Sequence, residues 1–152
     1  MTGGTRHDHF MGEALALARR AAQLDEVPVG AVVVQGDQVI GRGWNTVITD
    51  QDPTAHAEVN ALRAAAQAVG NYRLPGCDVY VTLEPCPMCA GALVTARIQT
   101  VIFGATDPKA GAGGSIFQVL KNPLLNHQCA ILEGIGADES ARLLRNFFKA
   151  RR

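Results

Sequence analysis

The chain has 152 residues, no formal net charge, and 47% hydrophobic and 18% charged side chains. This length suits one domain spanning 1–152 with a single core, and the balance excludes a disordered or fibrous chain. No apolar stretch approaches the roughly 18 residues of a membrane span, and residues 1–9 lack the apolar core of a secretory signal. The sequence therefore predicts a cytoplasmic protein without a membrane partner.

Charge is unevenly distributed between the two parts of the chain. Residues 1–96 carry six basic and ten acidic side chains, whereas residues 97–152 carry eight basic and four acidic ones. Such asymmetry is a weak indication of a polyanionic partner.

The first predicted elements are a helix and a β-hairpin. Apolar residues recur at helical spacing over about residues 9–24, and Pro28 ends that helix. Residues 29–34 and 39–44 are apolar runs on either side of a polar turn, which predicts two antiparallel strands. A polar loop then leads to Pro53.

Helices and strands alternate through the rest of the chain, which predicts an α/β fold built on a central sheet. Thr54 is the predicted N-cap of an Ala-rich helix over about residues 55–69, with His56 and Glu58 in its first turn. The further predicted elements are strands at 78–83, 100–104 and 129–132 and helices at 86–96 and 138–150.

Two half-motifs point to a catalytic metal site, His56-Ala57-Glu58 and, about thirty residues later, Pro85-Cys86-Pro87-Met88-Cys89. One imidazole and two thiolates give Zn²⁺ three protein ligands, and the fourth position stays open for water, as in catalytic zinc sites. The pattern His-x-Glu…Pro-Cys-x-x-Cys is the signature of the zinc-dependent nucleobase deaminases. The sequence thus predicts one zinc ion held by His56, Cys86 and Cys89.

Glu58 is the predicted catalytic residue, which moves protons rather than binding the metal. Two thiolates neutralise the charge of Zn²⁺, so we expect the metal alone to acidify water weakly and to need a nearby base. Glu58 takes a proton from the activated water and delivers protons to the ring nitrogen and the leaving amine of the base. The N-termini of both helices favour thiolates at Cys86 and Cys89.

Other histidines and the Cys-x-x-Cys pair have simpler interpretations. A Cys-x-x-Cys alone is more often a structural zinc site or a redox pair, but no second pair supplies a fourth ligand here. His7 and His9 are expected in a frayed terminus rather than in a second metal site, and His127 in a surface loop.

Two further features carry no chemistry of their own. Cys77 and Cys129 are expected to be small buried thiols rather than a disulfide. The loop at 111–115 lacks the Gly-Lys-Ser/Thr of a phosphate-binding loop, so it is either a flexible lip for the substrate or a simple turn.

Longer segments resemble the bacterial tRNA-specific adenosine deaminases, which belong to the cytidine deaminase-like zinc deaminases. The resemblance implies a three-layer fold with a mixed sheet of about five strands and helices on both faces. It also implies conversion of the wobble adenosine of a tRNA anticodon to inosine by a homodimer whose two subunits both contact RNA. The resembling segments are 26–32, 43–45, 52–58, 71–74, 80–86, 89–92, 103–105 and 147–152.

The same resemblance implies which residues bind the substrate. Asn45 hydrogen-bonds the flipped-out base, Val29 and Leu83 line its pocket, and Asp107 and Lys109 lie beside the anticodon nucleotides. A basic stripe on the last helix is a solvated face or, given the resemblance, a contact for phosphates. The stripe consists of Arg142, Arg145, Lys149 and Arg152.

Two other functions share parts of these motifs. A zinc-dependent deaminase of a free base or nucleoside, such as guanine or cytosine, would have the same metal site but no dependence on tRNA. A zinc-stabilised RNA-binding module without catalysis would bind tRNA and leave its bases unchanged.

Overall fold

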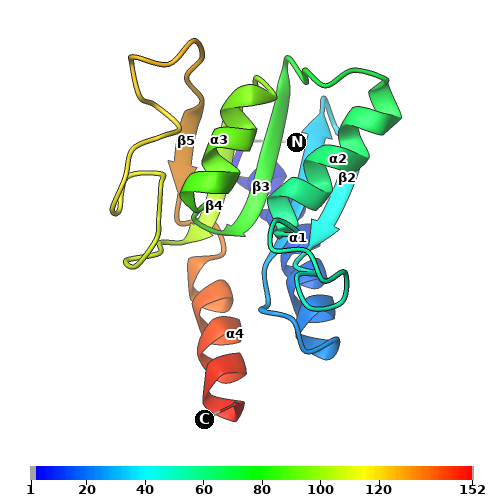
Figure 1. Ribbon diagram of the computed structural model, residues 1–152, viewed down its shortest axis with the longest axis vertical. Helices are drawn as coiled ribbons and strands as arrows, with labels where there is room; N and C mark the ends of the chain where they lie inside the picture. The colour runs from blue at the N-terminus through cyan, green and yellow to red at the C-terminus, as the bar shows by residue number, and fades with distance from the viewer. Residues whose placement is uncertain (1–2, 152) are drawn as a thin grey trace.

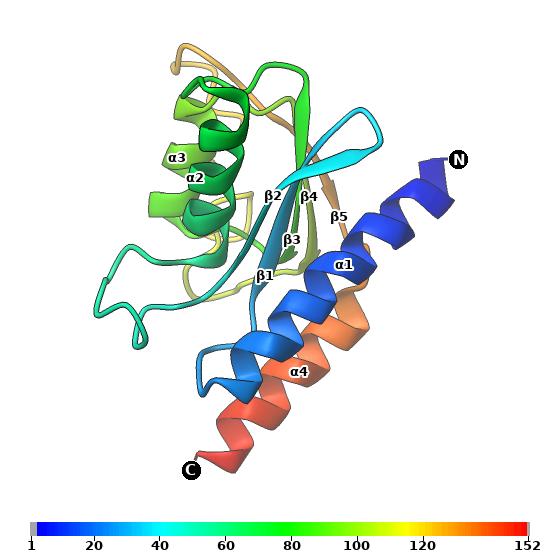
Figure 2. The same cartoon turned by 90° about the vertical axis from the view of Figure 1, so that its right-hand side faces the viewer.

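The computed structural model describes residues 3–151 and places one five-stranded sheet between two layers of helices (Figures 1 and 2). Every element predicted from the sequence is present. The elements in chain order are α1 (Gly3–Gln23), β1 (Gly30–Gln35), β2 (Gln38–Trp44), α2 (Ala57–Val69), β3 (Cys77–Leu83), α3 (Pro87–Thr95), β4 (Thr100–Ala105), β5 (Ala130–Glu133) and α4 (Ala137–Ala150).

The sheet is mixed, in the order β2-β1-β3-β4-β5. Strand β1 pairs antiparallel with both β2 and β3, and β4 pairs parallel with both β3 and β5. Figure 2 shows α2 and α3 on one face of the sheet and α1 and α4 on the other. The predicted three-layer α/β architecture, a mixed sheet of five strands with helices on both faces, is confirmed.

Side chains of the central strands alternate between two cores, as the period of two in a strand requires. One core, between the sheet and α2 and α3, contains Val33, Val79 and Val101. The other, against α1, contains Val32 and Tyr80 with Phe10. Because the central strands are buried on both faces, they appear in the sequence as nearly continuous apolar runs.

Helix α2 lies directly on β2 because glycine occupies the contact. A Cβ atom at Gly43 would lie 2.4 Å from the carbonyl oxygen of Ala57 and 2.5 Å from the backbone nitrogen of Ala61. No side chain fits there, so the backbone of β2 contacts the backbone of α2. This contact fixes the start of α2, where the predicted site residues lie.

The N-terminal helix is longer than predicted, and the expectation of a frayed terminus at His7 and His9 is wrong. Both lie within α1, which begins at Gly3. His7 Nδ1 lies 2.7 Å from the hydroxyl oxygen of Tyr80, and His9 Nε2 lies 3.6 Å from a carboxylate oxygen of Glu13. Burial of the Tyr80 ring under α1 stabilises the first turns of the helix.

Other single-residue predictions have mixed outcomes. Cys77 and Cys129 are buried free thiols, as predicted. His127 lies in a loop, as predicted, but is half-buried, and its Nε2 lies 2.7 Å from the carbonyl oxygen of Ile98, so it attaches the loop before β5 to the connection between α3 and β4.

Between residues 3 and 151, no helix is both long and apolar enough to cross a membrane.

Candidate active site

The predicted metal ligands lie at the N-termini of two neighbouring helices on one face of the sheet. His56 is the N-cap of α2, and Cys86 is the N-cap of α3, both with extended backbones. Helix α2 thus begins at Ala57, two residues later than predicted, because the Thr54 hydroxyl donates to Asp52 Oδ1 (2.7 Å) instead of capping the helix. Pro at the first position of α3 suits a helix start, where no backbone N–H is needed.

His56, Cys86 and Cys89 form a group that could hold a metal ion, and it is the one such group among residues 3–151. His56 Nδ1 lies 3.6 Å from Cys86 Sγ and 3.5 Å from Cys89 Sγ. A tetrahedral zinc with Zn–S of about 2.3 Å and Zn–N of about 2.0 Å separates sulfur and nitrogen ligands by about 3.5 Å. The donor set and its spacing therefore fit zinc.

The two sulfur atoms differ in their protonation. The Cys89 thiol donates to the Cys86 sulfur and lowers the pKa of Cys86 to about 4, against the effect of burial and with a further contribution from His56. The same hydrogen bond and burial raise the pKa of Cys89. Metal binding would release the proton of Cys89, because zinc binds thiolates.

Glu58 lies in the first turn of α2 and is 4% exposed. Burial is the largest influence on its carboxyl group, and it raises the pKa of Glu58 to about 7. A carboxyl group that titrates near neutral pH can both accept and donate a proton during a reaction. The geometry thus places a carboxyl group that could transfer a proton beside the three candidate ligands.

His56, Glu58 and Cys86 line a cavity of about 420 Å³. Four predicted substrate-binding residues line it, namely Val29, Asn45, Leu83 and Asp107. Asn45 Oδ1 accepts the backbone N–H of Ala57 at 2.8 Å. This bond caps α2 from outside the helix and leaves the amide nitrogen of Asn45 as the end that can donate to a ligand.

Two further residues of this cavity, Glu26 and Glu84, were missed by the sequence analysis. Both are 2% exposed. Burial acts to raise the pKa of each, but their several hydrogen bonds lower it below the ordinary value of a glutamic acid. Each lies inside a segment that was used only as evidence of family resemblance, and nothing local in the sequence shows where its partners lie.

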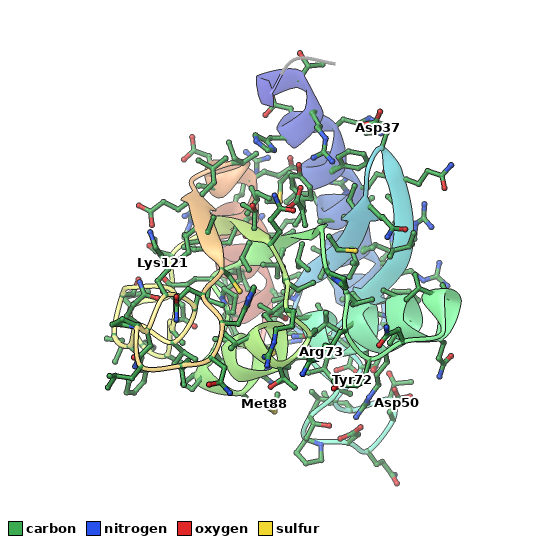
Figure 3. The ribbon with its side chains drawn as sticks, turned by 90° about the horizontal axis from the view of Figure 1, so that it is seen from above. Asp37, Asp50, Tyr72, Arg73, Met88 and Lys121 are labelled. Atoms are coloured by element: carbon green, nitrogen blue, oxygen red, sulfur yellow. The ribbon has the colours of Figure 1, made fainter. Side chains whose placement is uncertain are left out.

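Glu26 holds the loop between β2 and α2. Its carboxylate accepts the backbone N–H of Ile48 (3.2 Å) and both the N–H and the hydroxyl of Thr49 (2.7 Å each). Asp50, labelled in Figure 3, lies further out on this loop and accepts the Thr46 hydroxyl at 2.7 Å. The loop therefore forms one wall of the cavity.

A second cavity of about 780 Å³ lies next to the first, and both are lined by Val27, Leu83 and Asp107. Its lining adds positive charge and an aromatic ring from two segments far apart in the chain. The residues that supply these groups are Lys109, Arg145, Phe148 and Lys149.

The described residues of the predicted basic stripe do not all line the same cavity. Arg145 and Lys149 line the second cavity, whereas Arg142 is exposed and lines neither cavity. Arg152 lies outside the described residues. The neighbouring Arg151 is paired with Asp25 at 2.6 Å and lies over the ring of Phe147, which attaches the end of α4 to the end of α1.

Comparisons with known proteins agree with this geometry. Residues 5–152 match the model of the MafB19-like deaminase family. The chain is 47% identical to the tRNA-specific adenosine deaminase of Haemophilus influenzae, over 95% of this chain and 84% of that protein.

Solved structures are similar as well. A structure from work on A-to-I editing by tRNA:A34 deaminases has a TM-score of 0.87 and 47% identity, covering 90% of this chain and 99% of that one. A guanine deaminase from Bacillus subtilis has a TM-score of 0.66 and 40% identity, covering 75% of this chain and 71% of that one.

Proposed function

Since the chain belongs to the family of tRNA-specific adenosine deaminases, we propose that it converts the wobble adenosine of a tRNA anticodon to inosine by hydrolytic deamination. The observation that carries this proposal is the arrangement of one imidazole, two sulfur atoms and a buried carboxyl group at the floor of a cavity of about 420 Å³. That cavity opens beside a second, basic one that can receive the nucleotides around the target.

His56, Cys86 and Cys89 would hold one Zn²⁺ per chain. Their nitrogen and sulfur atoms have the spacing of a tetrahedral site, and they leave one direction open towards the cavity. When bound, zinc would supply a Lewis acid that activates water as the nucleophile together with a nearby base.

Glu58 is the proton carrier of the reaction. Its carboxylate accepts a proton from the attacking water and gives it to the ring nitrogen next to the reacting carbon. It then takes the proton of the hydroxyl group formed on that carbon and gives it to the leaving amine, which departs as ammonia while the carbonyl group forms. The pKa of about 7 that burial gives Glu58 suits both transfers, because neither form of the carboxyl group is strongly favoured at neutral pH.

Val29 and Leu83 would cover the flat faces of the flipped-out base, and the amide nitrogen of Asn45 would donate to an acceptor on its edge. The N–H of Ala57 fixes Asn45 Oδ1, so the amide cannot turn its oxygen into the cavity without losing that bond. A base in this position is read by shape and by one directed hydrogen bond.

The anticodon nucleotides beside the target would occupy the second cavity. Lys109, Arg145 and Lys149 supply positive charge for phosphates there, and Phe148, 49% exposed, offers a face on which a base can stack. Asp107 lies between the two cavities and so contacts both the target nucleotide and its neighbour. Arg142 would extend the contact to more distant phosphates, and Arg152 remains a phosphate contact predicted from the sequence.

The enzyme is proposed to act as a homodimer in the cytoplasm, where its tRNA substrate is found. Support for a second copy comes from exposed apolar side chains near the metal site and on the 111–128 loop. Met88, labelled in Figure 3, lies between Cys86 and Cys89 in the sequence. The exposed side chains are Met88, Ile116, Phe117, Leu124 and Leu125, with 38% to 91% of their surface accessible.

The test is inosine formation at the wobble position of an anticodon stem-loop, with Glu58→Gln as the inactive control. Free adenosine, cytidine and guanine are assayed in parallel. We expect inosine in the RNA from the wild-type protein alone. Ammonia release from a free base or nucleoside instead would favour the salvage deaminase, and tRNA binding without conversion of any base would favour a non-catalytic RNA-binding module.

A further inference from the structure

Glu84 directly follows the last residue of β3 and precedes Pro85 and Cys86. Its carboxylate accepts four hydrogen bonds. Oε1 accepts the backbone N–H of Asp107 (2.9 Å) and the hydroxyl of Ser115 (2.5 Å). Oε2 accepts the backbone N–H of Gly113 (2.9 Å) and of Ser115 (3.0 Å). All four donors belong to the single segment 107–115.

This segment is shaped to receive the carboxylate. A Cβ atom at Gly111 would lie 2.4 Å from the carboxyl carbon of Glu84, so a side chain there would displace the carboxylate from its donors. The N–H of Ala112 donates to the carbonyl oxygen of Pro85 at 2.8 Å, which adds a backbone contact next to the side-chain ones. The segment 107–115 is therefore attached to both Glu84 and Pro85, and the prediction of a flexible lip or a simple turn did not anticipate this attachment.

The attached segment forms the partition between the two cavities. Asp107 and Ala110 line the first cavity, and Asp107, Pro108 and Lys109 line the second. Asp107 Oδ1 accepts the backbone N–H groups of Lys109 (3.0 Å) and Ala110 (3.2 Å), so the turn is ordered from Asp107 onward. Glu84 therefore fixes the residue from which the whole partition extends.

A carboxylate offers about four acceptor positions, and here four donors occupy them. Glu84 has no acceptor position left for a substrate or a water molecule, unlike Glu58, which lines the same cavity. Its place two residues before Cys86 also means that one short stretch of chain carries both a candidate metal ligand and the attachment of the partition.

We propose that Glu84 is a positioning residue, which holds the 107–115 partition at a fixed distance from the metal site and so determines how the nucleotides around the target are bound. This inference rests on the proposed function. It assigns Glu84 no part in proton transfer.

The experiment compares zinc-loaded variants that alter the contact from both sides. Glu84→Gln replaces acceptor capacity with an amide whose own N–H groups oppose the donors. Gly111→Ala inserts a methyl group from the partition side, at a backbone position outside the left-handed region. Gly12→Ala is the matched control, since a Cβ there meets no atom within 4 Å.

We expect KM for the anticodon stem-loop to rise about tenfold in Glu84→Gln and in Gly111→Ala, the size of one lost hydrogen bond to a charged group. We expect kcat to change less than about threefold and one zinc per chain to remain. The double variant should be no worse than the worse single one, because both changes break the same contact. Gly12→Ala should match the wild type.

Amide hydrogen exchange at Asp107, Gly113 and Ser115 gives a second measurement that needs no turnover, and it should speed up in both variants. A fall in kcat at constant KM, loss of zinc, or unchanged KM and exchange would overturn the inference. The wild-type protein is assayed first. If it forms no inosine, the proposed function fails, whereas the attachment of the partition stands or falls on the exchange rates alone.

Discussion

The candidate base pocket contains three buried carboxyl groups, and the one in its floor differs from the two in its walls. Burial dominates at Glu58 and raises its pKa to about 7. Glu26 and Glu84 are also shielded from solvent, and burial acts to raise their pKa values, but three and four hydrogen bonds respectively outweigh it and lower them. The balance between burial and directed donors thus separates a group that can exchange a proton from one that holds a loop.

Among substitutions that distinguish the carboxyl group in the floor from those in the walls, Glu58→Gln is expected to have the largest effect. The amide cannot carry a proton, so kcat should fall about 10²–10⁴-fold, the usual contribution of positioned acid–base catalysis. Bound zinc should remain, because Glu58 is not among the three candidate ligands. Single-turnover rates and zinc content measure both, with exposed Glu133→Gln as the control. Near-normal rates would show that Glu58 does not transfer protons in the reaction.

The position of the floor depends on the contact between β2 and α2. Gly43→Ala places a methyl group 2.4 Å from the carbonyl oxygen of Ala57, so α2 must move and carry His56 and Glu58 with it. Overpacking of this kind costs about 1–3 kcal/mol, so both the free energy of unfolding and zinc affinity should decrease. Gly91→Ala on α3, where a Cβ meets no atom within 4 Å, is the matched control. Equal stability of the two variants would contradict the contact.

For the wall residue Glu26, the substitution Glu26→Gln is expected to change the free energy of unfolding and its pH dependence rather than kcat. It should lower the free energy of unfolding at pH 7 by about 1–3 kcal/mol, because the N–H groups of Ile48 and Thr49 lose a charged acceptor.

The direction of this pH dependence follows from the lowered pKa of Glu26 in the folded protein. Its stabilisation is present above the ordinary glutamate pKa and is lost as the pH falls through the lower folded value. Denaturant unfolding at a series of pH values should therefore show a smaller loss on acidification in Glu26→Gln than in the wild type. Parallel curves would mean that Glu26 is not held as a carboxylate.

The smallest effect is expected at the outer cavity. Lys149→Ala should weaken binding of the stem-loop a few-fold and reduce the slope of log K against log salt by about one phosphate contact, with kcat unchanged. Lys121, an exposed lysine that lines neither cavity, gives the control variant Lys121→Ala (Figure 3). The same salt slope in both variants would exclude a phosphate contact at Lys149.

The sequence predicted the elements well because their patterns are local. Strands β1, β3 and β4 are buried on both faces and appear as apolar runs, and α3 starts at a proline. Errors fell at helix ends. Helix α2 starts after His56 rather than after Thr54, because Asn45 from the end of the neighbouring strand caps it and the Thr54 hydroxyl is used within the loop.

The sequence by itself determined the identity of the reacting groups, since three donor types and a carboxylate at fixed spacing suit one metal chemistry. Only the tertiary structure decided which acidic side chains hold the loops that form the cavity walls, and which basic residues of α4 line a cavity. The partners of Glu26 and Glu84 lie more than twenty residues away along the chain. Such hydrogen bonds leave no local pattern, because they arise only when the sheet brings distant loops to one edge.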